Sequence, residues 1–399
     1  MTLPRLPRSA LAAVLGVAWL SACDLDVPDL NNPGIDTLQT HPDTVSIGAA
    51  CTGLLIGDRT QIANEFGYVD ELGILGREAY NFDAADPRFV NELLAGTLSQ
   101  ASPLGGNFWT VPYANIRLAN VILDALDKVP AGELDDSASA GVSGFAHTMI
   151  ALELLQVIVT RDTIGAVIDT DHDLSQPLGA IVGKDKVYAE IVRLLDAALP
   201  DLDLAGKTFP FLLSSGYAGF DTPPTFRKFN RALRARAAAY TQDYAAVRDA
   251  LAQSFLDDAA TADFTAGVYY TYSTKTGDTT NGLINPNIYV HPSVQADAQN
   301  KADGMPDDRY TAKVATTDNP GSVTGTPLAS SLVFNFPFCD SWKKKLRLSP
   351  PSADVARQFH NPSTLSSELL STSRRPANCT GASDFIRPVE STELTGSLA

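Results

Sequence analysis

The chain has 399 residues with a formal net charge of -16, and 44% of its residues are hydrophobic. This length and apolar content suit one large globular domain or two medium ones with a substantial core. The acidic balance excludes a protein that binds nucleic acid, or an anionic surface, through charge. We interpret the acidity mainly as a solubilising surface.

The first 22 residues have the parts of a secretory signal. Arg5 and Arg8 precede a short apolar run, which leads into Leu20-Ser21-Ala22-Cys23. About eleven apolar residues are too few to cross a membrane as a helix, which needs about twenty. No other apolar stretch in the sequence is near twenty residues long. The tetrapeptide resembles the lipobox of bacterial lipoproteins; the alternative is an ordinary cleaved signal with a chance cysteine.

The lipobox resemblance implies cleavage before Cys23, lipidation of its thiol and acylation of the new amino terminus, for example with palmitate. Several acyl chains anchor a protein firmly, because each buried methylene contributes about 0.8 kcal/mol. Residues 23–36, which contain prolines and asparagines, are expected to form a lipid-anchored tether. Asp24, Asp26 and Asp29 resemble surface-export signals of some outer-membrane lipoproteins, although in other bacteria an aspartate directly after the cysteine retains the protein at the inner membrane. We expect the outer membrane, facing the cell surface.

Helical periodicity dominates the middle of the chain. Apolar residues recur at three- and four-residue steps in "NIRLANVILDALDKVP", "HTMIALELLQVIV" and "VYAEIVRLLDAALPDL". The clearest pair is "FRKFNRALRARAAAYTQDYAAVRDALAQSF", where Leu233 marks one helix and Val247 the next, with a tight connection at residues 241–243. Alanines, tyrosines and the short turn resemble a tetratricopeptide helix pair, although no strict repeat of about 34 residues is present. Two helices of an ordinary α-domain are the alternative.

Two long stretches, residues 67–106 and 265–337, are rich in Gly, Asp, Asn, Thr and Pro and are predicted to be loops. Loops of that length are usually functional, and a helical scaffold that presents them suits binding. A glycan site needs aromatic rings against the C–H faces of sugars, with amide and acid side chains for the hydroxyls. These stretches supply eight candidate ligand-binding residues: Arg77, Tyr80, Asn81, Asp83, Tyr269, Tyr270, Tyr272 and Asn281.

Packing in the core or in a loop is the alternative for each of these tyrosines. In a strand, Tyr270 and Tyr272 share one face while Tyr269 takes the other. Trp109 and Tyr113 follow a helical apolar pattern and are predicted to be core residues.

No catalytic, metal or cofactor site is indicated. The sequence has no G-x-S-x-G, H-E-x-x-H or P-loop motif. Acidic residues are numerous enough for a paired-carboxylate glycosidase, but nothing marks two of them as a pair. "DTDHDL" resembles a calcium loop, yet Leu174 and Ala180 stand where an EF-hand needs glycine and a bidentate acid, so a solvated acidic loop is favoured.

The remaining cysteines fit no zinc site. With Cys23 lipidated, Cys51, Cys339 and Cys379 remain, and an odd number leaves at least one free thiol. The sequence does not choose a disulfide pair among them.

Taken in chain order, these segments resemble the SusD/RagB-like outer-membrane lipoproteins, partners of TonB-dependent transporters in nutrient uptake. "CDLDVPDLNNPGID" resembles the family's segment after the lipobox, and "FWTVPYANIRLANVILDALDKV" its Trp, Tyr and Ala-Asn helix. The later helical blocks follow in the family's order. The resemblance covers residues 23–345 and implies a mostly α-helical binding domain over 37–345, with degenerate tetratricopeptide-like helix pairs and long irregular loops.

The resemblance also implies a function. The protein would bind a nutrient, commonly an oligosaccharide, and deliver it to a SusC-like TonB-dependent transporter, with no catalysis and no cofactor. The alternatives are a surface-anchored glycan hydrolase and a structural or adhesion lipoprotein unrelated to nutrients.

Residues 346–399 depart from the family pattern. The family continues past a W-K-K-like stretch, here residues 342–345, into another amphipathic helix. This tail is instead rich in Ser, Thr, Pro and Arg, a composition that buries a face poorly. We interpret it as a frameshifted or truncated family terminus, with a genuine divergent tail as the alternative.

Overall fold

The computed structural model describes residues 35–346, apart from residues 100, 173–175, 178, 258–265, 274–279 and 335–341, and it describes residues 342–346 by their backbone. The predicted signal, Cys23, Cys339, Cys379 and the tail beyond residue 346 therefore lie outside the described residues. So does the predicted tether, apart from its last two residues. Those two, Ile35 and Asp36, already belong to a helix.

The described chain is mostly α-helical, as the sequence predicts. Short 3₁₀ turns occur at Asp162–Ile164 (η2), Ser215–Tyr217 (η3) and Gly282–Ile284 (η4), and a π-helix, η1, at Phe89–Leu94. The α-helices are α2 (Ile35–Thr40), α3 (Thr44–Thr60), α4 (Tyr68–Leu75), α5 (Asn107–Leu126), α6 (Asp136–Arg161), α7 (Lys184–Leu204), α8 (Pro223–Tyr240), α9 (Tyr244–Leu251), α10 (Pro292–Ala296) and α11 (Asp308–Lys313).

The strands form antiparallel pairs, and two of these pairs, β1–β5 and β4–β8, join distant parts of the chain. Within β1 and β5, Tyr80 stands opposite Tyr289. The pairs are β1 (Ala79–Asn81) with β5 (Ile288–Val290), β2 (Ala166–Val167) with β3 (Ile181–Val182), β4 (Val268–Tyr272) with β8 (Trp342–Leu346), and β6 (Val314–Ser322) with β7 (Ala329–Phe334).

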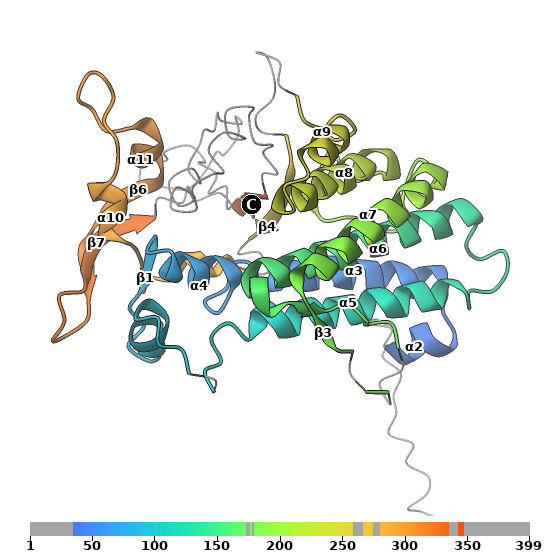
Figure 1. Ribbon diagram of the computed structural model, residues 1–399, viewed down its shortest axis with the longest axis horizontal. Coiled ribbons are helices and arrows are strands. Elements are labelled where there is room, and N and C mark those ends of the chain that lie inside the picture. Colours follow the sequence, from blue (N-terminus) through green and yellow to red (C-terminus); the bar gives the residue numbers. More distant parts are fainter. Residues whose placement is uncertain are drawn as a thin grey trace, which may run out of the picture.

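Consecutive helices pack on one another, α5 on α6, α6 on α7, α7 on α8 and α8 on α9, while α3 packs on α5. Figure 1 shows this helical stack at one end of the molecule, with β1, β6, β7, α10 and α11 at the other. The tight connection predicted at residues 241–243 separates α8 from α9. The predicted helix pair is confirmed.

Helix α6 is the centre of the core. From Gly141 to Ile158 nearly every residue is buried. Among the described helices, the segment Asp136–Ile164 is long and apolar enough to cross a membrane, but 83% of its most apolar window is buried inside the fold. The expectation that no second stretch reaches this length was therefore wrong. The stretch is hard to see in the sequence because Glu153 and Gln156, both buried in the fold, interrupt the run of apolar residues. It is a core helix.

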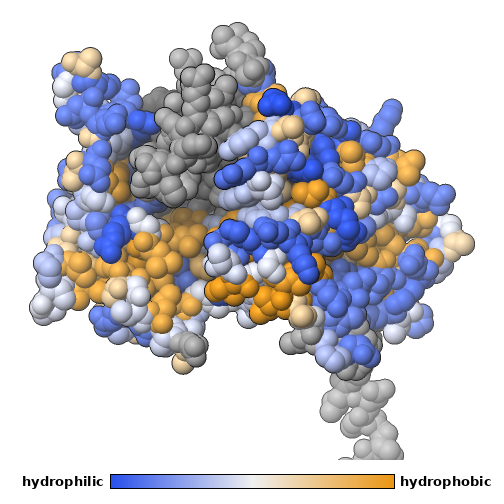
Figure 2. All heavy atoms as spheres, viewed as in Figure 1, coloured by the Kyte–Doolittle hydropathy of each residue, from blue (hydrophilic) through white to orange (hydrophobic). Residues whose placement is uncertain are grey.

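The outer surface is predominantly hydrophilic on the face seen in Figure 2, in line with the net charge. Hydrophobic residues gather on this face over the region where α4 and β1 lie in Figure 1. That region also borders the candidate binding site described below.

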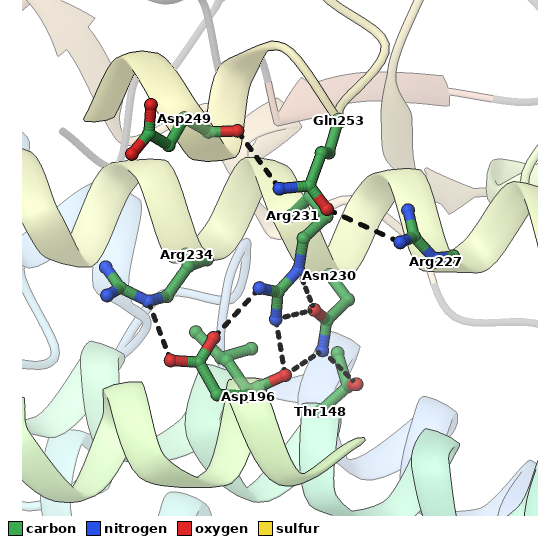
Figure 3. Close-up of polar contacts among 9 residues, drawn as sticks. Thr148, Asp196, Arg227, Asn230, Arg231, Arg234, Asp249 and Gln253 are labelled. Carbon is green, nitrogen blue, oxygen red and sulfur yellow. Dashed lines mark hydrogen bonds and ion pairs between the residues drawn. The ribbon is translucent and has the colours of Figure 1, made fainter. Parts of the chain in front are cut away.

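A polar cluster ties α7 to α8 (Figure 3). Arg231, 4% exposed, donates to Oδ1 of Asn230, to Oδ1 of Asp196 at 2.8 Å and to the carbonyl oxygen of Leu195. The Asn230 amide donates in turn to Oγ1 of Thr148, on α6, at 2.9 Å. A guanidinium and an amide can be buried between helices here because each finds partners.

Helices α6 and α7 are in close contact at Gly144. A Cβ atom at this position would lie 2.7 Å from Cγ of Leu202 and 3.1 Å from the carbonyl oxygen of Ala198. We expect Gly144→Ala to lower the free energy of unfolding by about 1–3 kcal/mol through overpacking, measured by urea denaturation. Gly53→Ala is the control, because its Cβ would meet nothing nearer than 3.7 Å and alanine favours the helix. Equal losses in the two variants would contradict the close packing.

The two stretches predicted to be loops contain more regular structure than expected. Residues 67–106 include α4, β1 and η1, and residues 265–337 include β4, β5, α10, α11, β6 and β7. Strands as short as β1 are held by pairing with a distant partner, here β5. Local sequence patterns do not reveal such pairing.

Candidate functional site

The candidate ligand-binding residues lie in two separate parts of the molecule, each with a surface pocket. The β1 pocket has a volume of about 390 Å³ and is lined by Arg77, Tyr80, Val90, Asn91, Leu94, Ala95, His291 and Leu328. The β4 pocket has a volume of about 330 Å³ and is lined by Thr52, Leu55, Ile56, Asp58, Arg59, Leu212, Leu213, Ser214, Tyr217, Tyr269, Tyr270 and Thr271.

The end of α4 brings Arg77 to the β1 pocket. The amide of Glu78 donates to the carbonyl oxygen of Gly73 at 2.8 Å and closes the last helical turn. Arg77 lies inside this closure with φ of 55°, the left-handed conformation in which glycine is usual. Its side chain is exposed. The chain then enters β1 with Tyr80.

Tyr80 forms the aromatic wall of the pocket. Its ring centroid lies 4.6 Å from that of His291 and 4.9 Å from that of Phe82. Tyr80 is only 6% exposed, so most of the residue is packed inside the fold while it also lines the pocket. The strand pairing of β1 with β5 places His291, which follows β5, beside it.

His291 is held in place by hydrogen bonds to its backbone and to its ring. Its backbone amide donates to the carbonyl oxygen of Glu78 at 2.9 Å, and its Nδ1 accepts from the amide of Ser293 at 3.1 Å. Burial, and then the neighbouring Arg77 guanidinium, lower the pKa of His291. With Nδ1 accepting, we assign the ring proton to Nε2 from this hydrogen bond.

Asn91 completes the polar lining. It lies on the π-helix η1 and is exposed, and within the described residues its side-chain amide has no hydrogen-bond partner. Val90, Leu94 and Leu328 supply apolar contacts. A guanidinium, an amide and an imidazole N–H beside an aromatic ring suit a ligand with both hydroxyls and apolar faces.

Asn81 and Asp83 support the pocket rather than line it. Asn81 is 1% exposed, and its amide donates to Oδ2 of Asp70 at 3.1 Å and to Oε1 of Glu65 at 3.3 Å. Its Oδ1 accepts from the amide of Asp83. Burial raises the pKa of Asp70 to about 7. These contacts fix the chain directly after β1.

The tyrosines of β4 attach this strand to α3. Tyr270 donates to Oδ1 of Asp58 at 3.0 Å and Tyr272 to the carbonyl oxygen of Arg59 at 2.9 Å. The shared face predicted for them is confirmed. Tyr272 is 1% exposed and lies outside both linings, in keeping with the core alternative, whereas Tyr269 and Tyr270 line the β4 pocket.

Asn281 is also buried, at 3% exposure, and its side chain accepts from the amide of Leu283 at the start of η4. Trp109 and Tyr113 pack against the main core, as predicted.

Two buried carboxyl groups lie between α3 and α6. Gln156 donates to Oδ1 of Asp58 at 2.7 Å, and Asn115 donates to Oε1 of Glu153 at 2.7 Å. Burial raises the pKa of Asp58 to about 7 and raises that of Glu153 well above its usual value. Glu153 is fully buried and outside the β4 lining, so the two groups do not form an accessible catalytic pair.

Among the described residues, no group of three or more His, Cys, Asp or Glu side chains is arranged to hold a metal ion. Asp173 of the acidic loop lies outside them. Cys51 is a buried free thiol in α3.

No protein-family model matches this chain, and no curated protein matches it significantly. Solved structures do resemble it. A SusD superfamily protein from Bacteroides vulgatus has a TM-score of 0.51 at 12% identity, over 70% of this chain and 63% of that one. A second one from the same organism has a TM-score of 0.50 at 15% identity, over 79% and 78%. A SusD-like carbohydrate-binding protein from Bacteroides fragilis has a TM-score of 0.50 at 13% identity, over 80% and 70%.

The chain therefore has the SusD-like fold, with tetratricopeptide-like helix pairs, and the resemblance seen in the sequence is confirmed for the fold. It spans 63% of the length of the first of these proteins.

Sequence reasoning selected Arg77 and Tyr80 but missed Asn91 and His291. Asn91 stands in a π-helix, and His291 reaches the pocket only through the pairing of β1 with β5. A polar side chain close to an aromatic strand was the one local signal available at His291.

Proposed function

We propose that this protein is a nutrient-binding protein that captures an oligosaccharide in the β1 pocket. The observation that carries the proposal is that Arg77, Asn91 and His291 line one pocket together with Tyr80, whose ring packs against that of His291. Sugars offer C–H faces to aromatic rings and hydroxyls to such donors. The volume of about 390 Å³ falls within the range of roughly 300–1,000 Å³ common for ligand pockets.

The proposal extends to location and partner. Lipidation of Cys23 would anchor the protein at the outer membrane, facing the cell surface, with residues 37–345 as the binding domain. It would deliver its ligand to a TonB-dependent transporter. The lipobox and the SusD-like fold support this assignment. Affinity purification from outer membranes in mild detergent tests it: we expect a large TonB-dependent β-barrel to co-purify, and a folded lipoprotein recovered without one would contradict it.

Binding would involve no covalent step. Retaining and inverting glycosidases need two carboxyl groups about 5–10 Å apart at the scissile bond, and no carboxylate stands among the described residues of the β1 lining. Turnover of a labelled polysaccharide by the purified protein would favour the hydrolase alternative.

Removal of the Asn91 amide tests the site itself. We expect Asn91→Ala to weaken oligosaccharide binding by about 3- to 10-fold, the loss of one hydrogen bond, as measured by isothermal titration calorimetry. Stability should not change, because the side chain is exposed. Gln39→Ala is the control, since this exposed amide lies on α2, away from the pocket. Unchanged binding by Asn91→Ala would contradict the assignment of the site.

A further inference from the structure

Arg77 differs from most arginines of this acidic chain. Within the described residues, its side chain has neither an ion pair nor a hydrogen bond, although it lines the β1 pocket. By contrast, Arg193, Arg227 and Arg309 each bond to a neighbouring carboxylate. A guanidinium that remains unpaired in a chain of net charge -16 is available for an external anion.

The backbone of Arg77 strengthens this observation. Its φ of 55° lies in the left-handed region, which L-residues other than glycine adopt at a cost. The Glu78 amide, bonded to the carbonyl oxygen of Gly73, holds it there. Glycine would serve the helix end better. Asp162 and Gln242 share this left-handed conformation but line neither pocket; of the three, Arg77 alone combines it with a place in a pocket lining.

The rest of the lining is also suited to an anion. The other polar groups are the Asn91 amide and the His291 imidazole, which is assigned as an N–H donor, and the described lining holds no carboxylate. The overall negative charge of the protein repels anions at long range. Attraction must then come from within the pocket, where Arg77 supplies a planar fork of donors that matches a carboxylate or sulfate.

We infer that the β1 pocket selects an acidic oligosaccharide, with its carboxylate or sulfate ester bound to the Arg77 guanidinium. The inference rests on the proposed function and names the ligand class of the same site. Arg77 is exposed, so added salt should weaken the preference for an acidic sugar.

The test compares sugars that differ only in charge. Isothermal titration calorimetry at low ionic strength would use trigalacturonate, its fully methylated ester and a sulfated oligosaccharide. We expect the wild-type protein to bind trigalacturonate, the sulfated sugar, or both about tenfold more tightly than the ester, as for one charge-assisted hydrogen-bonded pair. The preferred sugar identifies the anionic group.

Arg77→Gly should abolish this preference, so that it binds the acidic sugars and the ester with equal affinity. It should unfold at the same temperature or higher, because glycine relieves the left-handed backbone. Arg77→Lys, which keeps the charge, should retain part of the preference. Arg248→Ala, which removes an exposed charge on α9, is the matched control and should retain all of it.

Equal affinity for the acids and the ester, or an unchanged preference in Arg77→Gly, would overturn the inference and leave the proposed function intact. Failure of the wild-type protein to bind these sugars or any of a panel of neutral glucans would overturn both.

Discussion

Phe226→Ala is expected to lower the free energy of unfolding by about 3–5 kcal/mol, the usual loss when a large aromatic is truncated in a core. Phe226 is fully buried in the first turns of α8. Its ring centroid lies 5.5 Å from Phe145 on α6, 5.6 Å from Phe209 and 5.4 Å from Phe229. The cavity would therefore open where α6, α8 and the chain between α7 and α8 meet.

Urea denaturation, followed by circular dichroism, measures this loss. Leu212→Ala is the control, because Leu212 is 86% exposed and its truncation should change stability little. Because domains are stable by only about 5–15 kcal/mol, Phe226→Leu provides a milder variant with a smaller expected loss. A loss below about 1 kcal/mol for Phe226→Ala would show that these aromatic rings are not closely packed.

Asp58→Asn is expected to raise the free energy of unfolding by about 2–4 kcal/mol at pH 8.5 and to change this free energy little at pH 4. Burial raises the pKa of Asp58 to about 7, against about 3.9 in an unfolded chain. The folded state therefore holds this proton more tightly. The resulting stability is fully present below pH 4 and is lost as the pH rises through 7. Each pKa unit corresponds to about 1.36 kcal/mol.

An asparagine keeps the acceptor that Gln156 and Tyr270 use, since both donate to Oδ1, and it does not ionise. Unfolding free energies between pH 4 and 8.5 should therefore fall less steeply in Asp58→Asn than in the wild type. Asp249→Asn, at an exposed position on α9, is the control. Parallel pH profiles for Asp58→Asn and wild type would mean that the pKa of Asp58 is not raised in the folded state.

The helical part of the fold could be predicted because its signals are local. The apolar stripe of α7, with Val187, Ile191 and Leu195 buried, is visible in the sequence at steps of four residues. The same holds for α5 and for the α8–α9 pair. The strands could not be predicted, because β1 and β5 are three residues each and are separated by about half of the chain.

The candidate site was predicted only in part for a related reason. Arg77 and Tyr80 stand in one polar and aromatic stretch, which the sequence displays. Tyr272 and Asn281 belong to similar stretches, yet tertiary packing buries them. Burial and the partners of a polar group depend on distant segments, so composition alone cannot separate a binding tyrosine from a core tyrosine.

The central claim is that the β1 pocket binds an oligosaccharide, and hydrogen–deuterium exchange with and without a bound sugar tests it most directly. With a sugar identified by calorimetry, we expect slower amide exchange in residues 77–95 and 288–294, and no change in α3 or β4. Protection of α3 and β4 instead, with residues 77–95 and 288–294 unaffected, would contradict the claim and place the ligand in the β4 pocket.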